Sequence, residues 1–419
     1  MPSTLRDVQL ELARVLTDLA PEKHDEASMS AMTEALLEDA GLQLSASERD
    51  DLILSAVADF VSFGPIATAI RDPEVTEVMV NGPYRIFVER RGKREQLDVS
   101  FPDDVAVRAL IGRLLTVSPG HRVDAAVPFS DFSVPGGLRI NVVVPPVVTG
   151  GGHLTIRKYA RNMTTVEDLL RVGTVDRRLH TFLAAAIQGR LNVLYIGATG
   201  SGKTTLIDLY ATLIDPGERI VVIEDTYEFR FDQPNVVRLL TRAPNIEGRG
   251  AITTSDLFRN ALRMRPQRLI LGEIRGREAL EYLQAINAGH GGTLAVLHAG
   301  TPEEALVRIE HLVASSGIPV DPDVLRRQMA HGLDLVVLVA QQADGSRKVT
   351  RITEVGGVGD NGELEVFDLF RYEPITRSVD GKVIGRFLAT GRVPAFLDRL
   401  RLNGVTLPEG LFNNGGEAR

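Results

Sequence analysis

Apolar side chains recur at helical spacing through the first sixty residues. Leu5, Val8 and Leu12 begin the pattern, and further runs of the same spacing follow. The Ser47-x-x-Asp50 motif is a candidate N-terminal cap for the third of these runs. The pattern predicts a small helical bundle over residues 1–62, whose periodic apolar residues indicate core packing rather than chemistry.

Short extended runs replace the helical pattern from residue 63 onward. A helix is predicted only between Val105 and Leu115, and turn residues such as Asn81-Gly82-Pro83 separate the other runs. The simplest account is an α+β domain over residues 63–160. The predicted extended segments are 77–80, 85–88, 97–101, 138–144 and 154–156.

Apolar strand-like runs alternate with helical ones after a linker over residues 161–175. Such alternation predicts a mainly parallel sheet covered by helices, here over residues 176–375. Two later runs, 349–355 and 365–371, are predicted antiparallel edge strands, and residues 376–419 form a C-terminal extension with a helix at 395–402. The predicted parallel strands are 193–196, 220–223, 236–240, 269–271, 293–297 and 335–339.

Composition indicates a soluble globular protein. The 419 residues are 44% hydrophobic and 24% charged, which suggests two or three domains. No apolar run approaches the ~20 residues of a membrane span, and no basic leader precedes an apolar region. The absence of cysteine excludes disulfides and fits a reducing cytoplasm. A net charge of −8 is not typical of a molecule that binds nucleic acid over its whole surface, which leaves local basic patches open. Only 5% aromatic residues argue against a base-stacking platform for single strands.

A glycine-rich stretch follows the strand-like run that ends at Ile196. It fits G-x-x-x-x-G-K-[ST], in which glycines let the backbone fold around a polyphosphate and aim its N–H groups at the oxygens. Lys203 would bridge the β- and γ-phosphates, and the Thr204 hydroxyl would ligate Mg²⁺. A strand before and a helix after favour this interpretation over a chance turn. The predicted loop comprises Gly197, Ala198, Thr199, Gly200, Ser201, Gly202, Lys203, Thr204 and Thr205.

Acidic residues at the ends of strands beside this loop are candidates for metal and water chemistry. Glu273 ends an apolar strand of Walker B shape, although Gly272 occupies the usual aspartate position. Glu273 would polarise water or order the metal shell. Glu224 ends another strand and Glu228 follows it. With Thr204, the carboxylates of Glu224 and Glu273 are the candidate metal ligands, and ordinary solvated charges are the alternative.

Two histidines flank the strand-like run 293–297. His290 precedes it in Gly-His-Gly-Gly, and His298 follows it. An imidazole near a γ-phosphate can donate a hydrogen bond and so sense hydrolysis. A lone histidine is more often structural or exposed, and no cluster at zinc-ligand spacing accompanies these two.

Taken together, these motifs resemble the type II/type IV secretion ATPases, over roughly residues 50–412. The phosphate loop, an Asp box at 223–228, a Walker B segment at 271–275 and a His box at 289–298 come in that family's order. Within the family the chain is similar to the CpaF-like ATPases of tight-adherence (Tad) pili. The stretches that carry this closer resemblance are 77–82, 122–124, 137–146, 154–158 and 346–355.

The resemblance implies a RecA-like P-loop ATPase domain of α/β class, preceded by an α+β (PAS-like) domain and the helical bundle. It implies a homohexamer that binds ATP and Mg²⁺ and acts on inner-membrane platform proteins from the cytoplasmic face, with membrane association only through those partners and no nucleic acid. In such rings arginines of the N-terminal domain reach the γ-phosphate. Arg139 and Arg157 match those positions, and Arg263 and Arg275 match basic residues near the Walker B strand.

Three functions remain open from the sequence. The leading hypothesis is a cytoplasmic motor ATPase for pilus assembly or secretion. A nucleic-acid translocase or helicase on the same core is a second, since fold alone does not fix the substrate. The third is a nucleotide-dependent switch that hydrolyses ATP slowly.

Overall fold

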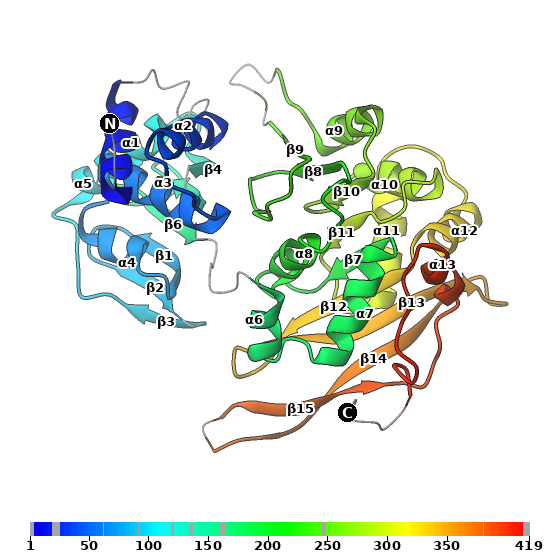
Figure 1. Ribbon diagram of the computed structural model, residues 1–419. Coiled ribbons are helices and arrows are strands. Elements are labelled where there is room, and N and C mark those ends of the chain that lie inside the picture. Colours follow the sequence, from blue (N-terminus) through cyan, green and yellow to red (C-terminus); the bar gives the residue numbers. More distant parts are fainter. Residues whose placement is uncertain are drawn as a thin grey trace. The chain divides into compact units, whose positions relative to one another are not determined.

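The computed structural model describes residues 4–18, 26–61, 63–90, 92–118, 121–134, 137–158, 165–242, 244, 249–379 and 381–413. The chain divides into two compact units, each with its own sheet (Figure 1). The N-terminal unit comprises residues 1–164 together with 226–230. The second unit comprises residues 165–225 and 231–419 and is called the ATPase unit below, after the domain that the sequence predicts there.

The N-terminal unit combines helices with a six-stranded antiparallel sheet of order β3-β2-β1-β6-β5-β4. Its helical elements are α1 (Leu5–Asp18), α2 (Glu26–Asp39), α3 (Ala46–Val61), the 3-10 turn η2 (Gly64–Ile66), α4 (Ala67–Arg71) and α5 (Asp104–Thr116). Its strands are β1 (Val75–Asn81), β2 (Ile86–Arg90), β3 (Lys93–Gln96), β4 (Phe129–Val134), β5 (Leu138–Val143) and β6 (His153–Lys158).

The three N-terminal helices share one buried core with this sheet. Val8 and Leu12 of α1 belong to the same cluster as Val78 of β1 and Ile156 of β6. Burial against the sheet therefore explains the helical periodicity of the first sixty residues.

Three local predictions in this unit are corrected. Helix α3 is capped by Ser45, whose hydroxyl accepts from the Glu48 N–H, rather than by the Ser47 motif. Strand β3 precedes the predicted segment 97–101, and β4 was not predicted. Every side chain of β3 is exposed, so the strand leaves no apolar signal and depends on its hairpin with β2.

The ATPase unit is built on a nine-stranded sheet of order β15-β14-β13-β12-β7-β11-β10-β8-β9, parallel from β12 to β9 and antiparallel from β12 to β15. Its strands are β7 (Val193–Ile196), β8 (Ile220–Glu224), β9 (Val236–Leu240), β10 (Arg268–Leu271), β11 (Leu294–Leu297), β12 (Leu335–Gln341), β13 (Arg347–Val358), β14 (Leu364–Arg377) and β15 (Val383–Ala389).

Helices cover both faces of the parallel part of this sheet (Figure 1). Leu194 and Ile196 face α9 to α12 in one buried cluster, while the alternate residues Val193 and Tyr195 are fully buried on the face of α7 and α8. Two-sided burial explains why these strands are continuous apolar runs. The helical elements are α6 (Val166–Arg171), α7 (Arg177–Gln188), α8 (Lys203–Ala211), α9 (Thr254–Ala261), η3 (Leu262–Met264), α10 (Glu278–Asn287), α11 (Pro302–Ser315), α12 (Pro322–Gly332) and α13 (Leu397–Leu402).

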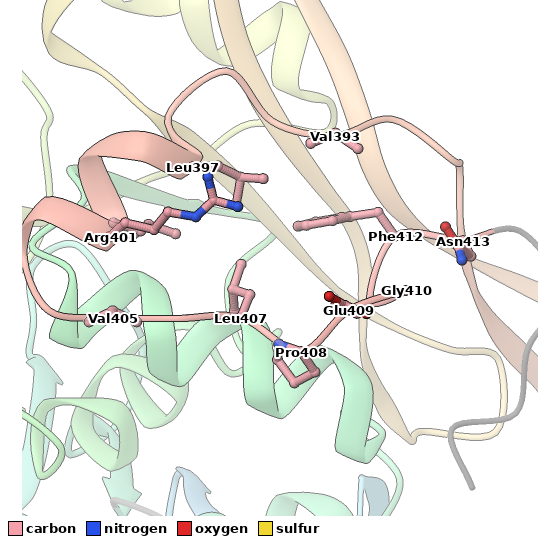
Figure 2. A pocket seen from close by; sticks show the side chains of 11 residues that line it. Val393, Leu397, Arg401, Val405, Leu407, Pro408, Glu409, Gly410, Phe412 and Asn413 are labelled. Carbon is pink, nitrogen blue, oxygen red and sulfur yellow. The ribbon is translucent and has the colours of Figure 1, made fainter.

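The C-terminal segment returns over the ATPase unit after β15. Phe412 packs against Phe182 of α7 and Phe370 of β14, with ring centroids 5.6 Å apart in both pairs. A hollow of about 180 Å³ lies between α13 and the chain that follows it, lined in part by Leu397 and Leu407 (Figure 2). This hollow is at the C-terminal segment and does not include the phosphate loop.

Candidate active site

The candidate residues of the ATPase unit gather where its parallel strands end. The loop 197–205 follows β7, and the pairing of Ile196 with Leu297 places His298 level with Gly197. Strand β10, which precedes Glu273, lies beyond β11, and β8 with Glu224 lies one strand further. At ~4.8 Å per strand, these two strands are ~10 and ~14 Å from β7. Strand β11, which lies next to β7, is therefore followed by a histidine and not by the acid that the sequence predicted.

The backbone of the loop requires glycine at three positions. Gly197, Gly200 and Gly202 have φ of +145°, +75° and +102°. A Cβ on Gly197 would lie 2.2 Å from the Val339 carbonyl oxygen, so the loop passes directly against β12. The buried Ser201 hydroxyl has no hydrogen-bond partner among the residues that the structure describes. Helix α8 starts at Lys203, so its N-terminus and the loop form one anion-binding arrangement.

A chain of polar contacts runs from the loop lysine to the Walker B glutamate. Lys203 is 6% exposed, and its ammonium donates to the carbonyls of Gly197 and Ala198, at 2.9 and 2.8 Å. Its Nζ also lies 3.4 Å from His298 Nδ1, and His298 Nε2 lies 3.3 Å from Glu273 Oε1. Because an ammonium can only donate, Nδ1 is the acceptor and the Nε2–H faces the carboxylate.

The charges along this chain follow from its surroundings. Burial, reinforced by the charge of Lys203, lowers the pKa of His298, so the imidazole is neutral at neutral pH. Burial raises the pKa of Glu273, but the hydrogen bond from Arg275 and the nearby positive charges outweigh it and the net shift is downward. The three groups therefore differ in charge. Lys203 is a cation, Glu273 is an anion, and the neutral imidazole of His298 connects them.

Arg275 ties the Walker B segment to the Asp box. Its guanidinium lies 2.6 Å from Glu273 Oε2 and 3.2 Å from Asp225 Oδ2. The backbone N–H groups of Arg275 and Gly276 donate to Glu278, which is buried at the start of α10. Asp225 could not be selected from the sequence, because a carboxylate beside Glu224 and Glu228 carries no distinguishing signal of its own.

Glu224 is buried at the end of β8, level with Gly272. A Cβ on Gly272 would lie 3.4 Å from Glu224 Cγ, so glycine at the usual aspartate position leaves room for this carboxylate. Across the described ranges, no three His, Cys, Asp or Glu side chains are grouped to hold a metal ion.

Two predicted residues lie at the opposite end of the parallel strands. His290 precedes β11 and Arg263 lies exposed in η3 before β10, whereas Lys203 and Glu273 follow the ends of their strands. His290 therefore belongs to the His box, and Arg263 precedes the Walker B segment, but neither reaches this site within the chain.

The predicted arginines of the N-terminal unit lie side by side. Arg139 of β5 and Arg157 of β6 are directly paired in the sheet. Arg139 makes a two-point ion pair with Asp131, at 2.7 and 3.3 Å, and its Nη1 lies 3.6 Å from Glu228 Oε1. Glu228 thus belongs to the N-terminal unit with these arginines.

Sequence reasoning also missed Arg347, at the start of β13. Its Nε donates to the Gly200 carbonyl at 2.8 Å, across 147 positions of the chain. The segment 346–355 was noted only for its resemblance, and nothing in its residues indicated a contact with the loop.

The fold and this site define a P-loop nucleotide-hydrolysing protein of α/β class. A family model described as "Type II/IV secretion system protein" matches residues 59–361. The chain belongs to this family. It is an ATP-hydrolysing enzyme of the type II/IV secretion class. The predicted RecA-like fold preceded by a further domain is confirmed.

Individual relatives agree with this family. A putative conjugal transfer protein of Mycobacterium tuberculosis is 35% identical over 283 residues, which cover 66% of this chain and 80% of that protein. Protein VirB11 of Agrobacterium fabrum is 32% identical over 303 residues, covering 65% and 87%. The solved pilus retraction motor PilT with bound ADP shares the fold, with a TM-score of 0.50 and 17% identity over 81% of this chain and 85% of that one. No described helix is both long and apolar enough to cross a bilayer.

Proposed function

We propose that this chain is the motor ATPase of a Tad-like type IV pilus or a related secretion machine, and that it works as a homohexamer at the cytoplasmic face of the inner membrane. The observation that carries the proposal is the Lys203–His298–Glu273 chain beside the loop, since it joins a phosphate-binding cation to an ionised carboxylate through a neutral imidazole. The motifs that resemble the CpaF branch support the pilus assignment.

Each residue has a defined task in this proposal. The loop N–H groups and Lys203 bind the β- and γ-phosphates, for which Lys203 exchanges its bonds to loop carbonyls for bonds to phosphate oxygens. Glu273 orients and polarises the attacking water, and Arg275 holds that carboxylate ionised. His298 transmits the loss of the γ-phosphate from Lys203 to Glu273.

Mg²⁺ would be held by Thr204, with Glu224 and Glu273 ordering its waters, and would neutralise charge on the phosphate oxygens. Arg139 and Arg157 would add positive charge from an N-terminal unit, with Glu228 positioning Arg139. Closure of these arginines on the nucleotide would convert hydrolysis into movement, which membrane platform proteins would receive.

Steady-state ATPase and nucleotide binding of two variants test the assignment. We expect Glu273→Gln to reduce turnover at least ~100-fold while ADP and ATP affinities stay within a few-fold, because the amide cannot polarise water. Lys203→Ala should lose nucleotide affinity itself. An unchanged rate for Glu273→Gln would remove Glu273 from the mechanism, and stimulation of the wild-type rate by DNA would favour a translocase.

The proposed hexamer is tested by mass measurement with and without a non-hydrolysable ATP analogue. We expect a six-subunit mass that increases in population with the analogue, because nucleotide contacts from a second subunit stabilise the ring. A protein that stays monomeric at all concentrations would contradict the ring while leaving the ATPase assignment intact.

A further inference from the structure

The outer side of the phosphate loop is held by a side chain from a distant strand. Arg347 Nε donates to the Gly200 carbonyl at 2.8 Å, and a Cβ on Gly202 would lie 3.1 Å from Arg347 Cδ. The side chain therefore lies directly over the segment Gly200–Gly202. The Gly200 carbonyl and the Ser201 N–H belong to one planar peptide and point in opposite directions. When Arg347 holds the Gly200 carbonyl on one side of the peptide, the Ser201 N–H must point to the other side, into the loop. There the Ser201 N–H donates to the Ala198 carbonyl at 3.3 Å.

The turn that presents Arg347 is itself fixed by one carboxylate. Asp344 Oδ1 accepts from the Ser346 N–H and hydroxyl, at 2.9 and 2.7 Å. Its Oδ2 accepts from the Val383 N–H at 2.7 Å, and Val383 is the first residue of β15. Burial raises the pKa of Asp344, but these hydrogen bonds outweigh it and bring the pKa to about 2, so Asp344 is ionised.

The two contacts form one continuous connection from β15 to the phosphate loop. Residues 344–347 lie within the range matched by the family model, whereas Val383 lies beyond its end at residue 361. A C-terminal strand outside the family match is therefore hydrogen-bonded to the turn that holds the loop.

We propose that the β12–β13 turn is a positioning element for the phosphate loop, in which Arg347 orients the Gly200 peptide and Asp344 lets β15 hold Arg347 in place. Arg347 and Asp344 are positioning residues, because they act on the nucleotide through the loop. The inference rests on the proposed phosphate-binding role of residues 197–205. It assigns the C-terminal hairpin β14–β15 a part in setting nucleotide affinity.

The test compares ADP affinities of the full-length protein, measured with a fluorescent ADP analogue. Arg347→Gln should weaken binding ~10-fold, the scale of one lost hydrogen bond from a charged group. Arg347→Lys, which keeps a donor and the charge, should recover most of that loss. Asp344→Asn keeps one acceptor but puts an amide donor against either Val383 or Ser346, and it should weaken binding by ~3-fold, less than Arg347→Gln.

A double variant separates a positioning role from general destabilisation, because only a positioning role predicts non-additive losses of ADP affinity. Because Asp344 acts through Arg347, we expect the double variant Arg347→Gln/Asp344→Asn to bind no more weakly than Arg347→Gln alone. The control is Arg386→Gln on β15, since Arg386 is exposed and pairs only with Glu373 across the same hairpin in the described structure. It should leave affinity unchanged.

Each outcome distinguishes the hypotheses. Unchanged affinity in Arg347→Gln, with binding lost in Lys203→Ala, would overturn this inference and keep the proposed function. Independent, additive losses would overturn the connection through Asp344. A wild-type protein that binds no ADP would overturn the proposed function itself. If Arg347→Gln fails to fold, Asp344→Asn decides, since its expected ~3-fold loss of ADP affinity with an unchanged melting temperature supports the proposal and no loss contradicts it.

Discussion

His298 joins a cation to an anion only while its ring is neutral. Protonation would place a second positive charge 3.4 Å from Lys203 Nζ and remove the acceptor at Nδ1. Burial and Lys203 both oppose that protonation, which is why the pKa of His298 is lowered. The pattern of residues around His298 could suggest its position after a strand, but its protonation state depends on a lysine 95 positions away.

This lowered pKa predicts a specific pH dependence of stability. Between the ordinary histidine value of about 6.5 and the lower native value, the unfolded chain binds more protons than the folded chain, so stability falls as the pH falls through this window. His298→Gln removes that contribution, and we expect its free energy of unfolding to fall less between pH 7.5 and 5.5 than that of the wild type. Urea unfolding at both pH values measures the difference. The other half-buried histidines with a lowered pKa, such as His121 and His180, are present in both proteins, so their contributions to the difference cancel.

The phosphate loop depends on how closely its backbone approaches β12. Two of its glycines form a matched pair, since both have positive φ but only Gly197 is crowded. Gly200→Ala meets nothing within 4 Å and should cost about 1 kcal/mol of backbone strain. Gly197→Ala places a methyl group 2.2 Å from the Val339 carbonyl oxygen and should cost roughly 3 kcal/mol or more. Urea unfolding measures both, and equal losses would contradict this description of the loop.

Burial decided which elements could be predicted from the sequence. Strands β7 and β8, in which every residue is buried, were predicted to within one residue of their bounds, because apolar runs between glycine, proline and polar turns give a strong signal. Strand β3 is fully exposed and β15 is an edge strand interrupted by Gly385, so neither shows a clear alternation. A buried polar contact also left no signal in the sequence. The Asn192 side chain donates to the Gly332 carbonyl and accepts from the Thr293 N–H. These two hydrogen bonds tie together the starts of three strands.

At the scale of the whole chain, the order of motifs along the sequence differed from their order across the sheet. The loop, Glu273 and His298 were predicted as site residues in that order of motifs, but β11 arrives later in the chain than β10 and still lies between β10 and β7. His290 was predicted from its imidazole beside a strand-like run and Arg263 from the family resemblance, and strand direction places both at the end of the strands away from the phosphate loop. Strand order and direction follow from long-range pairing, which local patterns do not encode.

The C-terminal segment illustrates the same dependence on long-range packing. It lies beyond the family match, which ends at residue 361, yet buried carboxylates of the ATPase unit hold it. Arg399 pairs with Asp334, and Glu354 accepts from the Ala395 N–H at 2.6 Å and pairs with Arg392 at 3.2 Å. Phe412 then completes an aromatic cluster with Phe182. The segment is therefore part of the core of the ATPase unit rather than an appended tail.

Truncation of that aromatic anchor tests this conclusion. Phe412 is 7% exposed, and we expect Phe412→Ala to lower the free energy of unfolding of the ATPase unit by about 3 kcal/mol, since it removes a packed ring and leaves a cavity beside Phe182. Leu402→Ala, in the same segment but 86% exposed, should change it by less than ~0.5 kcal/mol. Urea unfolding followed with and without ADP assigns the transition, because only the unit that binds nucleotide is stabilised by it. Equal effects of the two substitutions would contradict the packing of this segment on the ATPase unit.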